Sequence, residues 1–118
     1  MIYELRSYWI EPDVFDQYVD WVNTRAQPLQ REKFGFRVIG FWTVGAEDGT
    51  VDEDPPNVVW LTAWESREER ERVWTTLRAS PEWATIREGM PNFHRKPGNV
   101  KFLDAIAFSP LTLSLIHI

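Results

Sequence analysis

Apolar and polar residues alternate along four stretches of the chain, a period of two that is typical of β-strands. The stretches are residues 2–10, 36–44, 58–65 and 100–108. They are rich in β-branched and aromatic residues, which favour the extended conformation. The pattern therefore predicts four strands, distributed over the whole length of the chain.

Between the first two strands the apolar spacing lengthens to three and four residues, which is the period of an α-helix. The apolar stripe consists of Val14, Phe15, Tyr18, Val19, Val22, Ala26 and Leu29. This helix should start at Asp13 and end at Gly35. Pro28 interrupts the stripe, and because proline lacks a backbone N–H it should kink the helix or split off its last turn.

A second helix is predicted directly after the third strand. Ser66 and Glu69 have the spacing of a capping box, in which each side chain binds the other residue's free N–H. The expected core side of this helix carries Val73, Trp74 and Leu77. Ser80 should cap a short third helix, whose apolar side carries Trp83, Ile86 and Met90. Residues 45–56 and 91–99 have no period and are predicted to be loops.

The order of these elements predicts an α+β fold of the ferredoxin-like βαββαβ type, with a four-stranded antiparallel sheet and the helices on one face. Small aliphatic side chains are expected beneath the helices: Leu5, Ile39, Val59, Leu61, Ala63, Leu103 and Ala105. The opposite face would carry Glu4, Arg6, Tyr8, Val38, Trp42, Trp60, Thr62, Trp64, Phe102 and Asp104. A bare face with so many aromatic rings would be a large exposed apolar patch. We therefore expect a second copy to cover it, which gives a dimeric α/β barrel with one cavity per subunit.

Composition narrows the classes of partner. A chain of 118 residues with 18 acidic and 13 basic side chains has a formal net charge of −5, which argues against nucleic acid or an anionic membrane as partner. No apolar run approaches the roughly 20 residues of a membrane span, and no signal peptide is expected. The chain has no cysteine, so disulfides and thiol catalysis are excluded. A cytoplasmic protein is the expectation. Seven Trp residues exceed what a small core usually hides, and surplus aromatic rings favour a pocket or an interface.

Four motifs in order resemble the NIPSNAP family. Residues 1–8 read MIYELRSY, residues 61–72 read LTAWESREERER, residues 80–83 read SPEW, and residues 108–111 read FSPL. The resemblance implies a ferredoxin-like domain over residues 1–111 that forms a dimeric barrel. Residues 112–118 have no counterpart in the family, and are expected to be a swapped strand, a disordered tail or a vector-derived segment.

The family resemblance also bears on the ligand site. Families with a similar barrel include cofactor-free monooxygenases, haem-degrading enzymes, and cyclases or isomerases, and the fold alone does not choose among them. One departure is Thr62, because relatives often carry Trp two residues before the aromatic residue on this strand. The residues expected to bind a small apolar or aromatic molecule are Arg6, Tyr8, Trp42, Trp60, Thr62, Trp64 and Phe102.

Three hypotheses about function remain open at this point. The protein could bind a small molecule in the cavity, act as a cofactor-free monooxygenase or isomerase on an aromatic substrate, or serve as a non-catalytic dimer whose Trp residues fill the interface. As an enzyme it would need a base, and Glu4 or Asp104 would have a raised pKa if it were desolvated among aromatic rings. Alternatively, Glu4 and Arg6 simply neutralise each other.

No cofactor is expected, and haem is the alternative to that expectation. Haem needs an axial ligand, for which the chain offers only His94 and His117. His94 has Arg95 and Lys96 as neighbours that could meet the propionates, but surface-loop histidines are usually inert. No metal site and no glycine-rich phosphate loop is predicted, because no local spacing assembles either.

Overall fold

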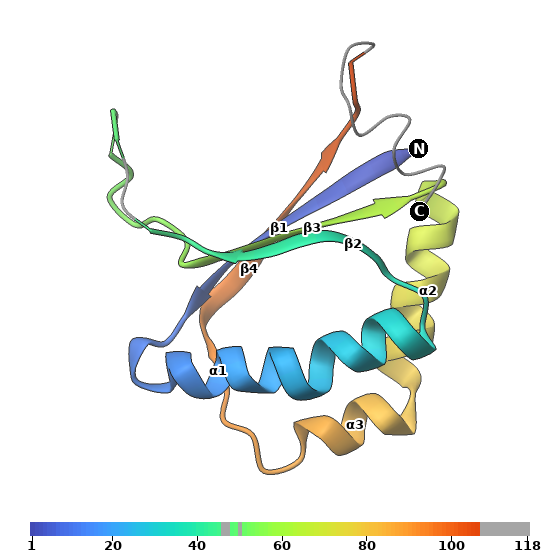
Figure 1. Cartoon of the computed structure of the whole chain (residues 1–118), viewed down its shortest axis with the longest axis horizontal. Coiled ribbons are helices and arrows are strands. Elements are labelled where there is room, and N and C mark those ends of the chain that lie inside the picture. The colour runs from blue at the N-terminus through green and yellow to red at the C-terminus, as the bar shows by residue number, and fades with distance from the viewer. Residues whose placement is uncertain (46–47, 50, 107–118) are drawn as a thin grey trace.

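The computed structural model describes residues 1–45, 48–49 and 51–106 and has the expected ferredoxin-like architecture. Its strands are β1 (Ile2–Ile10), β2 (Arg37–Thr43), β3 (Val58–Trp64) and β4 (His94–Leu103). They form one antiparallel sheet in the order β2-β3-β1-β4, so the first and third strands lie at its centre (Figure 1).

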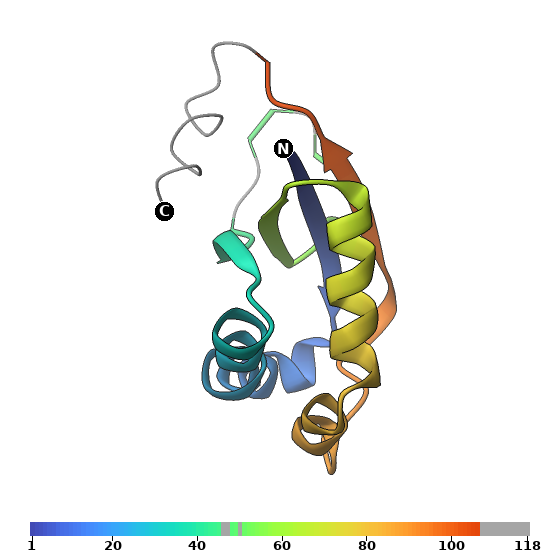
Figure 2. The ribbon, with the colours of Figure 1, turned by 90° about the vertical axis from the view of Figure 1, so that its right-hand side faces the viewer.

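Three helical segments cover one face of this sheet (Figures 1 and 2). They are α1 (Phe15–Trp21), which continues through the π-helical segments η2 (Val22–Ala26) and η3 (Leu29–Lys33), then α2 (Arg67–Ala79) and α3 (Pro81–Arg87). Within the described ranges, every helix falls short of the length and apolar character that a membrane crossing needs.

Pro28 lies between the two π-helical segments, and this explains how the first helix accommodates it. The N–H of Gln27 donates to the carbonyl of Val22, and that of Phe34 to the carbonyl of Leu29, each five residues back. Proline cannot donate the hydrogen bond of a regular turn, so widened turns flank it instead of a break. The helix then ends at Gly35, whose φ of 72° suits glycine.

The predicted caps are present with one difference. The Ser66 hydroxyl accepts a hydrogen bond from the N–H of Glu69 at 3.1 Å, but the Glu69 carboxylate accepts from the N–H of Glu65 at 2.7 Å instead of from Ser66. The Ser80 hydroxyl accepts from the N–H of Trp83 at 3.1 Å and caps α3 as expected. Both helices therefore start where the sequence places their caps.

The expected assignment of the two sheet faces is wrong. Trp60 and Trp64, which are 2% and 0% exposed, lie beneath the helices and pack with Trp74 and Leu77 of α2. The aliphatic residues that were expected beneath the helices instead face away from them, and Leu103 is 41% exposed, whereas Ala105 lies beyond the end of β4. We call this second surface the outer face, formed by Tyr3, Leu5, Ile39, Val59, Leu61, Ala63 and Leu103.

A β-bulge in β2 accounts for a second misassignment. Val38 pairs with Thr62 but Gly40 pairs with Leu61, so one extra residue interrupts the alternation. Phe41 therefore lies opposite Trp60 beneath the helices, whereas Trp42 lies on the other side and is 49% exposed. The Trp42 ring covers Gly40, where an added Cβ would meet it at 2.2 Å.

The last strand is displaced towards the N-terminus relative to the prediction. It starts at His94, inside the predicted loop, and ends at Leu103. Leu103 pairs with Tyr3, the second residue of β1, and is the last residue of β4. The predictions for the tail, including His117 and residues 107–118, lie outside the described residues.

The Glu4 carboxylate is the centre of a buried polar network that joins sheet and helix. It is 0% exposed and accepts hydrogen bonds from Arg70 at 2.6 Å, Arg6 at 2.7 Å, Trp64 at 3.0 Å and Trp74 at 3.1 Å. Two of these donors, Arg70 and Trp74, belong to α2. Burying a charge is tolerable only with such complete pairing, so Glu4 dictates that this face is the covered one.

Replacing Glu4 by Gln should strongly destabilise the protein, because the guanidinium groups of Arg6 and Arg70, which are only 13% and 10% exposed, would lose the buried carboxylate that both of them bind. We expect Glu4→Gln to lower the free energy of unfolding by about 3–5 kcal/mol in urea titrations. The control is Glu71→Gln, which removes the exposed partner of Arg70 and should cost about 1 kcal/mol or less. Equal effects of the two substitutions would contradict the central role of Glu4.

Candidate ligand-binding site

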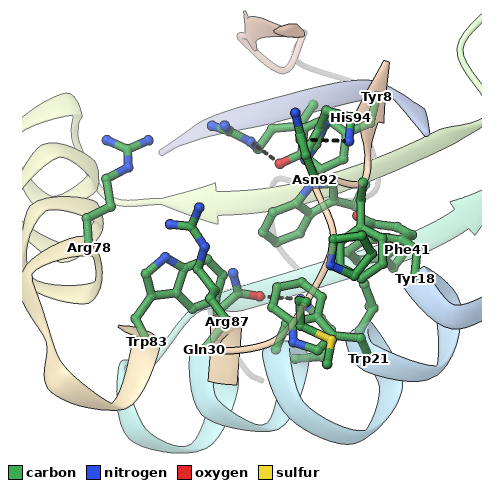
Figure 3. Close-up of a pocket in the computed structure, with 18 of the residues that line it drawn as sticks. Tyr8, Tyr18, Trp21, Gln30, Phe41, Arg78, Trp83, Arg87, Asn92 and His94 are labelled. Atoms are coloured by element: carbon green, nitrogen blue, oxygen red, sulfur yellow. Dashed lines mark hydrogen bonds between the residues drawn. The ribbon is translucent and has the colours of Figure 1, made fainter. Parts of the chain in front are cut away.

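A cavity of about 790 Å³ lies between the covered face of the sheet and the helices. Strands contribute Arg6, Tyr8, Phe41 and Trp60 to its lining. Helical segments contribute Tyr18, Trp21, Val22, Ala26, Gln27, Gln30, Trp74, Arg78, Trp83, Ala84 and Arg87. The chain between α3 and β4 and the first residue of β4 contribute Glu88, Met90, Pro91, Asn92, Phe93 and His94. Every layer of the fold thus takes part in this one site (Figure 3).

Aromatic rings form one wall of the cavity. The Trp21 ring lies 5.7 Å from that of Trp83 and 5.6 Å from that of Phe93, and the Tyr18 ring lies 5.2 Å from Phe93. The Trp21 indole N–H donates to the carbonyl of Ile86 at 2.7 Å. This hydrogen bond ties α3 to the first helix, so the wall is held in place rather than loosely packed.

Tyr8 is held in a defined position on the sheet side. Its hydroxyl accepts a hydrogen bond from Nε of Arg6 at 2.7 Å, and its ring meets that of His94 edge to face at 4.9 Å. Behind it lies Gly98 of β4, where an added Cβ would come within 2.7 Å of the Tyr8 ring. Glycine at this position therefore lets the neighbouring strand approach the tyrosine closely.

His94 lines the cavity at the start of β4. Burial lowers the pKa of its imidazole below the ordinary value, and the nearby charges of Arg6 and Arg87 lower it further. The lowered pKa favours the neutral form of the ring. Its Nδ1 atom is buried and has no hydrogen-bond partner among the described residues.

Neither carboxylate that was considered as a base lies in the cavity lining. Burial acts to raise the pKa of Glu4, but the hydrogen bond from Arg70, the charge of Arg6 and the hydrogen bond from Trp74 outweigh it, so the pKa is lowered. The expectation of a raised pKa is therefore wrong for Glu4. Asp104 is exposed and lies just beyond the end of β4.

The other residues singled out from the sequence are distributed over four places. Arg6, Tyr8, Trp60 and His94 line the cavity. Thr62 and Trp64 lie outside its lining, buried around Glu4, and Phe102 lies under Arg67, whose guanidinium carbon is 3.7 Å from the ring centroid. Trp42 lines a separate hollow of about 910 Å³ beside β2.

Sequence reasoning missed the helical half of the site. Trp21 lies off the apolar stripe of the first helix, and no pattern in the sequence singled out Arg78 and Arg87, which are exposed at the ends of α2 and α3. Phe41 was missed because the bulge was not recognised, although a glycine inside a strand is a signal for one. For Trp83 the signal was present, since it lies on the predicted apolar side of its helix.

Comparisons with known proteins agree with this architecture. The NIPSNAP family model matches residues 3–110. A NIPSNAP family protein of unknown function from Agrobacterium tumefaciens is 22% identical over 94% of this chain and 93% of its own, with a TM-score of 0.76. An uncharacterised NIPSNAP-like domain protein from Burkholderia xenovorans is 25% identical over 92% and 88% of the two chains, with a TM-score of 0.76.

More distant structures share only the fold. One is a putative antibiotic biosynthesis monooxygenase from Nitrosomonas europaea, with 12% identity, coverage of 90% of this chain and 99% of its own, and a TM-score of 0.60. No match was found among curated proteins.

The lowered pKa of His94 gives a testable pH dependence. The imidazole should titrate below 6.5 in NMR spectra of the folded protein, with the His94→Gln variant assigning its signals. Because the unfolded chain then binds the proton more readily, His94 contributes stability above pH 6.5 that is lost as pH falls through its folded pKa. We therefore expect His94→Gln to flatten the pH dependence of unfolding below pH 6.5. A folded pKa of 6.5 or higher would contradict the burial of this ring.

Proposed function

Because this chain belongs to the NIPSNAP family, we propose that it is a homodimeric protein that binds a small aromatic molecule in the cavity between its sheet and its helices. The observation that carries the proposal is the cavity itself. Its 790 Å³ falls within the roughly 300–1,000 Å³ of small-molecule sites, and its lining combines aromatic walls with a few polar groups.

The cavity also bears on the hypothesis that the Trp residues only fill an interface. Trp60 is covered by the helices of its own chain, and open space remains beside it. This arrangement supports ligand binding over a purely structural role for the aromatic residues. The site differs from the expected one in that the subunit's own helices, and not a partner subunit, form the opposite wall.

A cofactor-free enzyme is the second candidate, and His94 is the observation that favours it. A neutral imidazole beside an aromatic ligand can take a proton from a hydroxyl group, the step that was expected of Glu4 or Asp104. The proposal invokes no cofactor, and His94 is also the residue that would ligate haem if haem were bound. The test is oxygen uptake in the presence of an aromatic ligand. Uptake that requires the ligand would support the enzyme hypothesis if His94→Gln abolishes it while ligand binding persists.

The outer face supports the homodimer. Leu5, Leu61 and Val59 are only half-buried there, and Leu103 is 41% exposed. Half-buried aliphatic side chains on this face are stabilised by removal from water, and a second copy offers a matching surface. The proposed barrel therefore joins two outer faces and leaves each ligand cavity on the far side of its own sheet.

Ligand binding can be tested by narrowing the cavity without touching the core. Ala84 lines the cavity from α3 and is exposed, so Ala84→Trp should fold normally but obstruct the site. We expect it to weaken binding of the neutral fluorescent ketone prodan about tenfold, which corresponds to about 1.4 kcal/mol of lost contact. The matched control is Ala79→Trp, also exposed on a helix but outside the lining. Equal binding by both variants would place the probe elsewhere.

The dimer can be tested by its size in solution. Light scattering during gel filtration should give about twice 13.9 kDa for the native chain. Leu61→Glu should convert it to a monomer, because a charge in the middle of the joined outer faces would be desolvated without a partner. Val51→Glu changes an equally apolar residue that is 67% exposed and lies outside the sheet, and it should leave the dimer intact. A native monomer at these concentrations would refute the barrel.

A further inference from the structure

The charges around the cavity are unbalanced, and this bears on the ligand's chemistry. Arg78 and Arg87 both line it, and no carboxylate among the described residues forms an ion pair with either. Arg6 is already neutralised by Glu4 at 2.7 Å. Within the described part of the chain, Glu88 is the one carboxylate of the lining.

Both arginines are also positioned by the aromatic residues of the site. The guanidinium carbon of Arg78 lies 4.8 Å from the ring centroid of Trp74, and that of Arg87 lies 6.0 Å from Trp83. Figure 3 shows the two side chains on the same side of the cavity, opposite Tyr8 and His94. Cations near helix C-termini are common because they complement the helix dipole. Complementing the helix dipole does not by itself explain why the last-turn arginines of two different helices both line one cavity.

We propose that the ligand is an aromatic carboxylate whose charged end lies between Arg78 and Arg87 and whose ring lies against the aromatic wall of Trp21 and Trp83. This inference rests on the proposed function, because it names the chemical class of the molecule in that same cavity. Guanidinium groups suit carboxylates, since the planar fork of donors matches the two oxygen atoms.

The test compares two probes that share one ring system and differ in charge. The probes are 2-naphthoate and 2-naphthamide, titrated by calorimetry at low salt. We expect the acid to bind about tenfold more tightly, and to lose this advantage at about 1 M salt, where the screening length falls to about 3 Å. Equal binding of acid and amide would overturn the inference while leaving the proposed function intact. Absence of binding by both naphthalenes and by prodan would refute the proposed function itself.

Variants then assign the preference to the two arginines. Arg78→Gln/Arg87→Gln should bind the acid and the amide with equal affinity. Arg72→Gln, an exposed residue of α2 outside the lining, should keep the native preference. A double variant that still prefers the acid would overturn the assignment.

Discussion

A single buried carboxylate determines how this fold is put together. Glu4 is fully buried at the centre of the sheet and needs donors on every side. Neighbouring residues on the strands supply some of these hydrogen-bond donors. The set is complete only when α2 places Arg70 and Trp74 above the carboxylate. The orientation of α2, the choice of covered face and the position of the cavity beside it all follow from satisfying that charge. Hydrophobic burial stabilises the folded chain, whereas the ionic network around Glu4 specifies how the helix is placed on the sheet.

This constraint explains why the sequence predicts the elements better than the site. Alternation identifies β1 with its bounds intact, and the caps at Ser66 and Ser80 mark the helix starts, because these signals are local. Which face the helices cover depends on contacts between residues 66 positions apart, such as Glu4 and Arg70. Sorting side chains by size cannot reveal such a pair, and so the aromatic and aliphatic faces were exchanged.

The site itself lies mostly on elements that local patterns describe poorly. Val22 and Ala26 reach the cavity from the π-helical turns that flank Pro28, and widened turns are frequent at functional sites. Arg78 lies near the end of α2 and Arg87 at the end of α3, and only the folded structure places both in the lining of one cavity. The pocket is therefore a product of tertiary packing, and its chemistry becomes readable once the helices are placed over Glu4.

The two edges of the sheet limit how copies of this chain can associate. β2 carries the bulge at Gly40 and β4 contains Pro97 between Lys96 and Gly98, so neither edge offers a straight row of free hydrogen-bonding groups. Addition of a further strand at either side is disfavoured, which protects the chain against growth into ribbons or fibrils. The homodimer proposed above therefore uses the aliphatic outer face, and a two-fold contact through that face closes after two copies.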